Sequence, residues 1–332
     1  MRLEDLDYHL PEELIAQRPV EPRDSARLLV DHGSLPPVDA HVFDLPNYLR
    51  PGDALVVNHT RVFPARLRLL RRSGGAIEVL LLEDHGTVWT ALVRGGAKLR
   101  EGEELVDGDN TVVVRFVRRV EDVFEVELID ERWPLEHGEM PLPPYITERL
   151  EDGERYQTVY SHDARSAAAP TAGLHLTEPL LNEIRALGVR ILEVELVVGL
   201  DTFKPIDAQD PLQHHMHTEY YRVPIETWDA CRHVHESGGS VVAVGTTATR
   251  ALESAAATGE LSGRTSLYIT PGFSWQVVDK MMTNFHMPRT TLIMMISSMI
   301  GERWRALYGH AIDRRYRMLS FGDAMLLDRH AR

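Results

Sequence analysis

The sequence predicts an α/β fold: a layered α/β domain into which a small antiparallel β-barrel is inserted. Between about residues 62 and 130, short apolar segments alternate with turns that contain Gly or Asp, a pattern typical of a small barrel. From about residue 156 onward, helical and strand patterns alternate, which indicates a layered α/β domain. We therefore expect residues 1–61 and 156–332 to form the α/β catalytic domain and residues 62–155 to form the barrel.

Hydrophobic periodicity and turn residues place the individual elements. An apolar strand at 53–57 precedes the barrel and ends in a polar motif that we assign to the site, so the barrel is an insertion. The expected barrel strands are 76–83, 88–93, 112–120 and 123–129. The expected α/β elements are helix 177–187, strand 189–198, helix 226–237, strand 240–245, helix 247–257 and strand 266–270.

The segment Pro-Thr-Ala-Gly-Leu-His at 170–175 precedes a predicted helix start. Thr177 suits the N-cap, Pro179 the first turn, and Gly188 the left-handed residue beyond the helix end. A helix start exposes unpaired N–H groups and a partial positive charge, so it can bind a carboxylate or phosphate. His175 lies beside this start; the alternative is a tight turn with a structural histidine.

A similar loop follows the apolar run at 240–244. It has the sequence Gly-Thr-Thr-Ala-Thr-Arg at 245–250 and leads into a strongly helical segment. Ligands of open α/β sheets bind at such strand-to-helix crossings, although the threonines could also serve only as caps. The sequence has neither G-x-G-x-x-G nor G-x-x-x-x-G-K-[ST], which disfavours the usual dinucleotide fold and a P-loop.

The third polar segment covers residues 213–221. If this segment is extended, His215, His217 and Glu219 project from one face. We favour a catalytic or substrate-contacting strand. A zinc or iron site is a weaker alternative because the spacing is not a strong metal signature, and a solvated edge strand is the third.

Polar loops also occur at 58–66, 283–291 and 320–326, each beside an apolar run. Together with the segments above, and with 10–17, 22–24, 51–53, 141–146, 155–160 and 271–273, they resemble the S-adenosylmethionine:tRNA ribosyltransferase-isomerase family of queuosine biosynthesis. The matches follow the family order over nearly the whole chain.

The chain departs from the family pattern at a few positions. His59 stands where the family usually has Asp, Leu176 replaces Phe, and Met318 and Leu319 replace aromatic residues. His and Gly are replaced by Val198 and Asp201. Two of these departures, His59 and Asp201, change the local charge, which can alter pKa values or substrate affinity.

The resemblance implies an enzyme that transfers the ribosyl part of S-adenosylmethionine to the aminomethyl group of 7-aminomethyl-7-deazaguanine at the tRNA wobble position. The products would be epoxyqueuosine-tRNA, adenine and methionine. S-adenosylmethionine would be a co-substrate, with no metal or redox cofactor. The chemistry would need a base near C5′, a proton donor for adenine and a group that holds the methionine carboxylate.

We expect acid–base catalysis from His175, His217 and Glu219, because imidazoles and buried carboxylates can exchange protons near neutral pH. Thr171, Gly173, Thr246 and Thr247 are the expected donor pocket, with backbone N–H groups at the two helix starts holding the carboxylate. Further candidates for donor or nucleobase contacts are Asn58, Arg61, Arg250, Asn284, His286 and Asp323. A structural role is an equal alternative for each of these six.

Two other functions remain open at this point. An S-adenosylmethionine-dependent RNA methyltransferase would share the donor, but such enzymes normally carry a Gly-rich loop after the first strand, which 244–247 replaces poorly. A catalytically diverged tRNA-binding protein is suggested by His59 and Asp201.

The net charge of −14 disfavours a general nucleic-acid binder. An enzyme that binds a tRNA anticodon arm must therefore concentrate its positive charge. Arginine clusters at 66–72, 115–119 and 314–317 are candidate phosphate contacts. Because Lys occurs at three positions and the other 33 basic residues are Arg, the clustering also fits a GC-rich genome and carries little weight.

The remaining features lead us to expect a cytoplasmic protein. The single Cys231 excludes an internal disulfide, and residues 1–7 lack the pattern of a secretory signal. The long apolar segment at 291–300 is shorter than the ~20 residues that a bilayer-spanning helix needs. We expect a cytoplasmic monomer with no membrane partner.

Overall fold

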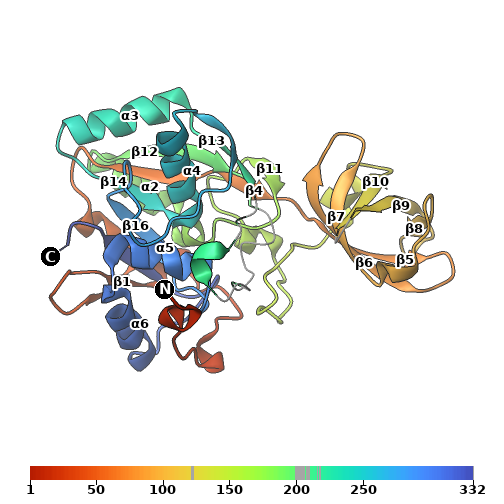
Figure 1. The fold of residues 1–332 in the computed structure, drawn as a ribbon, viewed down its shortest axis with the longest axis horizontal. Helices are drawn as coiled ribbons and strands as arrows, with labels where there is room; N and C mark the ends of the chain where they lie inside the picture. The colour runs from red at the N-terminus through yellow and green to blue at the C-terminus, as the bar shows by residue number, and fades with distance from the viewer. Residues whose placement is uncertain (121–122, 199–205, 207–209, 215, 217, 332) are drawn as a thin grey trace. The chain divides into compact units, whose positions relative to one another are not determined.

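The computed structural model describes residues 1–120, 123–198, 206, 210–214, 216 and 218–331. The chain divides into two compact units. The larger unit comprises Met1–Thr60, Pro143–Asp163 and Ala169–Arg332, and the smaller comprises Arg61–Leu142 and Ala164–Ala168. The predicted fold class is confirmed, because the larger unit is a layered α/β structure and the smaller contains a closed antiparallel barrel (Figure 1).

A mixed sheet of nine strands forms the centre of the described part of the larger unit. In spatial order, the strands are β15 (Ser262–Thr265), β13 (Glu219–Arg222), β12 (Arg190–Leu196), β3 (Ala54–Asn58), β14 (Val241–Val244), β16 (Lys280–Asn284), β17 (Ala324–Asp328), β1 (Arg27–Val30) and β2 (Val38–His41). Neighbouring strands from β12 through β16 run parallel. The carboxyl ends of four strands therefore meet at one edge of the sheet.

Helices cover the sheet on both faces, as a parallel sheet of continuous apolar strands requires. The described helices of this unit are α2 (Glu178–Ala186), α3 (Ile225–Glu236), α4 (Gly245–Thr258), α5 (Thr291–Ile300) and α6 (Arg303–Asp313). Helix α2 packs Leu180 and Leu181 into one core cluster with Leu55, Val57 and Val242. Helices α3 and α4 contact the same strands but contribute nothing to that cluster, so they cover the opposite face.

The ends of α2 follow the sequence prediction. The Thr177 hydroxyl oxygen accepts a hydrogen bond from the Leu180 N–H at 3.3 Å, which makes Thr177 the N-cap. Pro179 lies in the first turn, and Gly188 adopts a φ of 89° just beyond the helix. Capping and the expected left-handed turn are thus confirmed.

The predicted strand at 266–270 is wrong. The strand at this edge of the sheet is β15, which ends at Thr265, and the next five residues have no regular structure. The Leu267 N–H instead donates to the Thr265 hydroxyl at 3.0 Å, and Ile269 is buried. The apolar pattern here reflects burial of an irregular segment.

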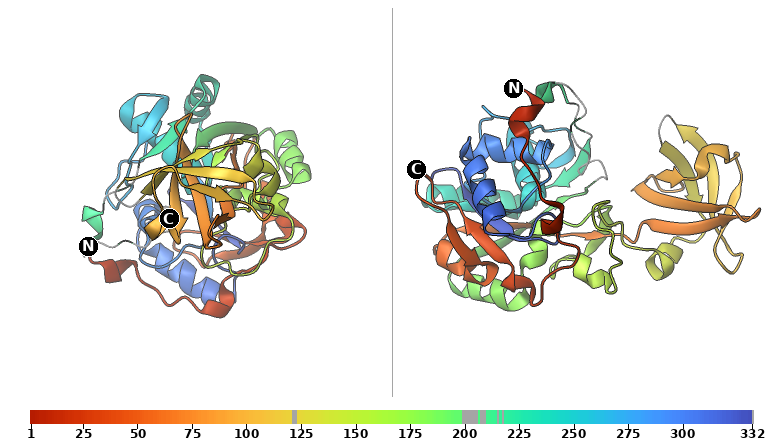
Figure 2. Two further views of the ribbon diagram at one scale, coloured as in Figure 1. Left: turned by 90° about the vertical axis from the view of Figure 1, so that its right-hand side faces the viewer. Right: turned by 90° about the horizontal axis from the view of Figure 1, so that it is seen from below.

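The smaller unit contains a closed barrel of six strands. Their order is β10 (Val123–Leu128), β7 (Trp89–Arg94), β6 (Ala76–Asp84), β5 (Arg66–Arg71), β8 (Glu104–Val106) and β9 (Val112–Val120), and Figure 2 draws them from two further sides. The four expected strands are confirmed, whereas β5 and β8 were not expected. In β5, Leu67 and Leu69 lie in the barrel core, and Arg68 is exposed. The first arginine cluster therefore includes the outer face of a barrel strand.

Two short strands and a short helix lie outside the barrel and the nine-stranded sheet. Strand β4 (Thr60–Val62) pairs with β11 (Asp163–Ser166), and α1 (Trp133–His137) follows β10. Within the described residues, no helix is both long and apolar enough to cross a lipid bilayer.

We predicted that the barrel insertion ends at residue 155. The compact unit that contains the barrel comprises Arg61–Leu142 and Ala164–Ala168, and residues 143–155 belong to the larger unit. The reason is a set of hydrogen bonds to the N-terminal segment: the Gln17 side chain donates to the Tyr145 carbonyl at 2.9 Å and accepts from the Thr147 N–H at 2.8 Å.

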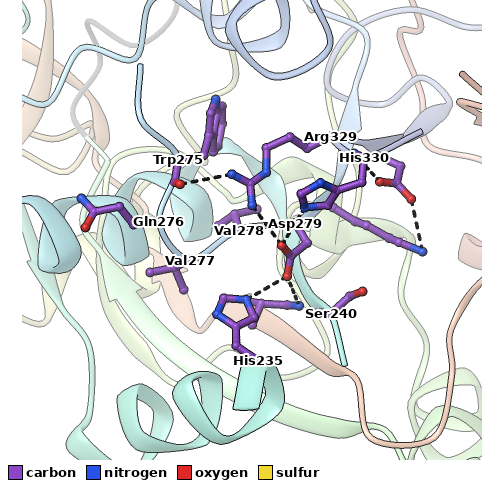
Figure 3. Close-up of polar contacts among 12 residues, drawn as sticks. His235, Ser240, Trp275, Gln276, Val277, Val278, Asp279, Arg329 and His330 are labelled. Carbon is purple, nitrogen blue, oxygen red and sulfur yellow. Dashed lines mark hydrogen bonds and ion pairs between the residues drawn. The ribbon is translucent and has the colours of Figure 1, made fainter. Parts of the chain in front are cut away.

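A buried carboxylate joins several segments at the amino ends of β14 and β16 (Figure 3). Asp279 accepts hydrogen bonds from the Val241 N–H and His235 at 2.9 Å each, from Arg329 at 3.0 Å and from His330 at 3.2 Å. Burial raises the pKa of Asp279, but these hydrogen bonds lower it by more than burial raises it. The pKa of Asp279 therefore lies below its ordinary value. The carboxylate ties α3 and the residues after β17 to the sheet.

We predict that Asp279→Asn destabilises the larger unit. The amide nitrogen cannot accept the hydrogen bonds that one carboxylate oxygen accepts, and leaving such buried donors unpaired costs about 1–3 kcal/mol. Thermal unfolding should show a melting temperature lower by about 2–4 °C for each kcal/mol. Asp229→Asn, at an exposed position on α3, is the matched control. Equal melting temperatures for Asp279→Asn and wild type would contradict this account.

Candidate active site at the carboxyl ends of the parallel strands

A cavity opens at the sheet edge where the parallel strands end. We call it the central cavity; its space is about 660 Å³, open solvent included. It is lined by Tyr145, Ala169, Pro170, Thr171, Ala172, Val198, Gly245, Thr246, Thr247, Thr283, Asn284, Phe285, His286, Met287, Thr290, Leu292, Leu319 and Ser320. These residues follow β12, β14 and β16 or lie in loops beside them, which is where ligands of α/β sheets bind.

Strand β14 turns directly into α4 at the cavity wall. Gly245 has a φ of 89°, a conformation that residues with a Cβ rarely adopt, and it begins the helix two residues earlier than predicted. Thr246 and Thr247 consequently stand in the first turn of α4 and face the cavity.

Asn284, at the end of β16, joins three segments behind the cavity surface. Its Oδ1 accepts a hydrogen bond from the Thr171 hydroxyl at 2.9 Å. Its Nδ2 lies 3.2 Å from the His175 Nε2 and 3.5 Å from the Asp323 carbonyl oxygen. Because an amide nitrogen can only donate, the His175 Nε2 accepts this hydrogen bond. The side-chain amide is therefore held in one orientation.

His175 is a buried, neutral imidazole. Burial lowers its pKa to about 4, and the nearby charges of Arg317, Arg23 and Arg155 lower it in the same direction. The residue is 5% exposed and does not line the central cavity. Because His175 lies behind Asn284, we infer that it orients the Asn284 amide and does not contact a substrate directly.

His286 and Tyr145 are the proton-exchanging side chains among the described residues of the cavity wall. The His286 Nε2 lies 2.9 Å from the Thr283 hydroxyl, and burial lowers the His286 pKa to about 3. The Tyr145 hydroxyl lies 2.7 Å from that of Ser320, and burial raises the Tyr145 pKa to about 12. Both side chains are therefore neutral at physiological pH.

A smaller cavity of about 360 Å³ adjoins the central one, and we call it the side cavity. It is lined by Met216, Glu219, Thr246, Thr247, Arg250, Leu267, Tyr268, Ile269, Thr291, Leu292 and Met295. Glu219 at the start of β13 and Arg250 on α4 form a buried ion pair in its wall. Thr246, Thr247 and Leu292 line both cavities, so the two spaces share a wall.

The chain matches the family model described as "Queuosine biosynthesis protein" over residues 3–327. It is 49% identical to the S-adenosylmethionine:tRNA ribosyltransferase-isomerase of Symbiobacterium thermophilum, with 98% of this chain and 100% of the relative covered. The chain belongs to this queuosine biosynthesis family. A relative of the same name from Carboxydothermus hydrogenoformans is 45% identical at the same coverage.

A solved structure from the same family supports the fold. The crystal structure of the S-adenosylmethionine tRNA ribosyltransferase from Thermotoga maritima matches with a TM-score of 0.57 and 36% sequence identity. The match covers 97% of this chain and 99% of that chain.

The departures from the family pattern lie in different environments. His59 is buried and stacks on His162 with ring centroids 4.1 Å apart, and it lines neither cavity. Leu176 belongs to the core cluster beneath α2. Val198 and Leu319 line the central cavity, so these two departures lie in its wall. Asp201 lies outside the described residues.

The structure brings most of the sequence-predicted residues together. Thr171, Thr246, Thr247, Asn284 and His286 line the central cavity, and Glu219 and Arg250 line the side cavity. His217 and His215, two of the three residues of the metal alternative, lie outside the described residues. Within the described residues, no group of three or more His, Cys, Asp or Glu side chains is arranged to hold a metal ion.

Four predicted residues, in addition to His175, line neither cavity. A Cβ on Gly173 would lie 2.0 Å from the Tyr160 hydroxyl, so this glycine permits close packing. Asn58 bonds both the N–H and the carbonyl of Leu196 and thereby ties β3 to β12. Asp323 accepts from the Arg27 and Arg317 N–H groups. Arg61 lies on β4 and lines neither cavity.

The start of α2 does not face the central cavity. Residues 171–175 form a short 3-10 helix of their own, and its first residues line the wall instead. The Thr177 hydroxyl donates to Asp24 at 2.7 Å. The expected anion site at this helix start is therefore displaced from the cavity.

Sequence reasoning missed several polar residues of the wall. Tyr145, Ser320 and Thr283 line the central cavity and stand in segments that carry the family resemblance. Their position in segments that resemble the family was the signal that could have identified them, but we did not predict a role for their hydroxyl groups.

We predict that His175 makes stability fall in mild acid. Its folded pKa of about 4 lies below the unfolded value of about 6.5, so its contribution is complete above pH 6.5. The contribution, of about 3 kcal/mol at most, is lost as pH falls from 6.5 to 4 because the unfolded chain takes up the proton first.

Denaturant unfolding between pH 7 and 4 checks this prediction. His175→Gln should flatten the decline, whereas His233→Gln, an exposed position on α3, should not. Parallel curves for wild type and His175→Gln would contradict the assignment of a buried neutral imidazole.

Proposed function

We propose that this chain transfers and isomerises the ribosyl part of S-adenosylmethionine onto the aminomethyl group of 7-aminomethyl-7-deazaguanine in tRNA. The products are epoxyqueuosine-tRNA, adenine and methionine. One observation carries the proposal: a cavity with hydroxyl, amide and imidazole side chains in its wall at the carboxyl ends of parallel strands, in a chain 49% identical over its length to a named ribosyltransferase-isomerase. The methyltransferase alternative is not favoured, because the relatives carry a different activity in their names.

The proposed chemistry starts at the sulfonium, which acidifies the neighbouring C5′ hydrogens. A base removes one C5′ proton, and adenine leaves by elimination while it takes up a proton. The tRNA amine then attacks C1′ and gives up a proton. The C5′ carbanion forms a bond to C1′ while the C1′–O4′ bond breaks, and O4′ then displaces methionine from C5′ and closes the epoxide across C4′ and C5′. Proton transfers and leaving groups account for every step, so we infer that the reaction needs no metal or redox cofactor beyond S-adenosylmethionine as co-substrate.

His286 is the proposed proton-transfer residue among the described side chains. It lines the central cavity, and its pKa of about 3 keeps the ring neutral, so the ring does not repel a cationic sulfonium. His175 is the proposed positioning residue, which holds the Asn284 amide toward the ligand through a hydrogen bond of 3.2 Å. His217 stays a candidate on sequence grounds.

The tRNA partner needs positive charge, and the barrel arginines offer little of it. Most of them are paired with carboxylates within the unit: Arg68 with Glu139, Arg71 with Glu103, Arg72 with Glu104, Arg115 with Glu127 and Arg118 with Glu125. In the third cluster, Arg314 is exposed and has no ion pair among the described residues, and Arg315 lies 4.0 Å from Glu13. We propose this cluster, close in sequence to Leu319 and Ser320 of the cavity wall, as the phosphate contact.

A cytoplasmic location and a monomeric state remain predictions of the sequence. Modification of tRNA suits the cytoplasm. Size-exclusion chromatography with light scattering checks the oligomeric state directly, and a dimer would overturn the prediction.

Product analysis tests the proposed activity. Purified protein is incubated with S-adenosylmethionine and tRNA carrying 7-aminomethyl-7-deazaguanine, and the products are identified by mass spectrometry. Adenine, methionine and epoxyqueuosine in equal amounts are expected. S-adenosylhomocysteine would establish a methyltransferase, and tRNA binding without any product would establish a diverged binding protein.

We predict that His286→Gln lowers kcat for adenine release about 100-fold or more, the usual loss when a general acid–base group is removed. Gln keeps a polar atom near Thr283 but cannot exchange protons. The dissociation constant for S-adenosylmethionine, from calorimetry, should change little. His233→Gln is the control, and a near wild-type kcat in His286→Gln would reject His286 as the proton-transfer residue.

We predict that Arg314→Ala combined with Arg315→Ala weakens tRNA binding at low salt. The slope of log Kd against log salt concentration should fall by about 1 for each phosphate group that the variant no longer neutralises. Arg118→Ala is the matched control, because Arg118 is paired with Glu125 at 2.7 Å. Filter binding across a salt series gives both quantities, and an unchanged slope in the double variant would place the tRNA elsewhere.

A further inference from the structure

The side cavity contains a buried arginine whose donors are only partly used. Arg250 is 5% exposed and Glu219 is 6% exposed, and Nη1 of Arg250 donates to Oε2 of Glu219. Nε and Nη2 of Arg250 have no hydrogen-bond partner within the described part of the chain. Buried donors without partners are costly, and a guanidinium presents its five N–H donors in a planar fork. The pattern indicates that a ligand supplies the missing acceptor.

The composition of the cavity wall narrows the ligand class. Arg250 offers paired N–H donors that match a carboxylate, and Glu219 beside it offers a negative charge for an ammonium group. The rest of the wall includes Leu267, Ile269 and Met295, which suit a short methylene chain. An α-amino acid with an apolar side chain combines all three requirements.

The wall that the two cavities share indicates that one ligand can extend from one cavity into the other. Thr246 and Thr247 line both spaces, and the Thr247 hydroxyl is buried without a partner among the described residues. A molecule with its nucleoside in the central cavity can therefore place an attached amino-acid chain beside Arg250.

We propose that Arg250 and Glu219 form the subsite for the methionine end of S-adenosylmethionine. Nε and Nη2 of Arg250 bind the α-carboxylate, and Glu219 binds the α-ammonium. This inference rests on the proposed function and assigns Glu219 to substrate binding in place of the acid–base role expected from the sequence. Arg303 and Arg329, which form ion pairs and line neither cavity, each leave one buried donor without a partner among the described residues, whereas Arg250 leaves two and lines a cavity.

Decarboxylated S-adenosylmethionine tests the subsite on the unmodified protein. This compound keeps the sulfonium, ribose and adenine but lacks the α-carboxylate. With tRNA carrying 7-aminomethyl-7-deazaguanine, wild type should release adenine from it with a KM about 10- to 100-fold higher than from S-adenosylmethionine, as loss of a charge-assisted hydrogen-bond pair implies. Equal KM values for the two co-substrates would overturn the subsite.

Variants show whether Arg250 is the residue that discriminates. Arg250→Met should raise the KM for S-adenosylmethionine and bring the KM ratio of the two co-substrates to within about threefold. Arg250→Met combined with Glu219→Leu removes both buried charges and thereby avoids an uncompensated carboxylate, so it guards against misfolding. Arg222→Met, at an exposed position on β13, is the matched control and should keep the wild-type ratio.

The outcomes separate the subsite from the activity. Absence of adenine from wild type with both co-substrates would reject the proposed function itself. Adenine release by wild type together with a wild-type KM ratio in Arg250→Met would leave the function intact and reject the subsite. Near-equal KM values in both Arg250 variants, with the control unchanged, support the subsite.

Discussion

The parallel pairing of β12, β3, β14 and β16 is the constraint on which the candidate site depends. Parallel strands direct their carboxyl ends to one sheet edge, so residues more than a hundred positions apart meet there. Thr246 follows β14, Asn284 ends β16 and Thr171 approaches from a separate 3-10 helix. The Asn284 amide then ties the end of β16 to the 3-10 helix by bonding to Thr171 and His175.

The two ends of the sheet carry different kinds of polar group. At the amino ends, the Asp279 carboxylate accepts hydrogen bonds from several elements, and its role is to hold them together. At the carboxyl ends, Arg250 and Thr247 line the side cavity and keep buried polar atoms without partners among the described residues. Satisfied buried groups indicate structure, whereas unsatisfied ones beside a cavity indicate a ligand.

Much of this arrangement could be predicted from the sequence, because local signals were strong. The continuous apolar runs of β3 and β14 and the caps of α2 are determined by nearby residues. The prediction of a strand at 266–270 was wrong because Ile269 is buried in an irregular segment. Such burial gives an apolar sequence pattern without any pairing to another strand. The arginines of β5 were candidate phosphate contacts on sequence grounds, and in the structure Arg66, Arg68 and Arg71 each pair with a glutamate.

The roles within the site could not be predicted, since they depend on contacts between distant residues. His175 was expected to be catalytic, yet the Asn284 amide stands between it and the cavity surface, and burial lowers its pKa. Glu219 was expected to exchange protons, yet Arg250 on another element pairs with it. His286 and Tyr145 gain their importance from a wall that forms only when the sheet and its loops are assembled.

A crystal structure of the protein soaked with S-adenosylmethionine in the absence of tRNA tests the central claim most directly. Our account predicts electron density for the nucleoside in the central cavity beside Asn284 and His286, with the methionine end at Arg250 and Glu219. Density for the co-substrate bound away from these two cavities, with both cavities filled by solvent, would contradict the account.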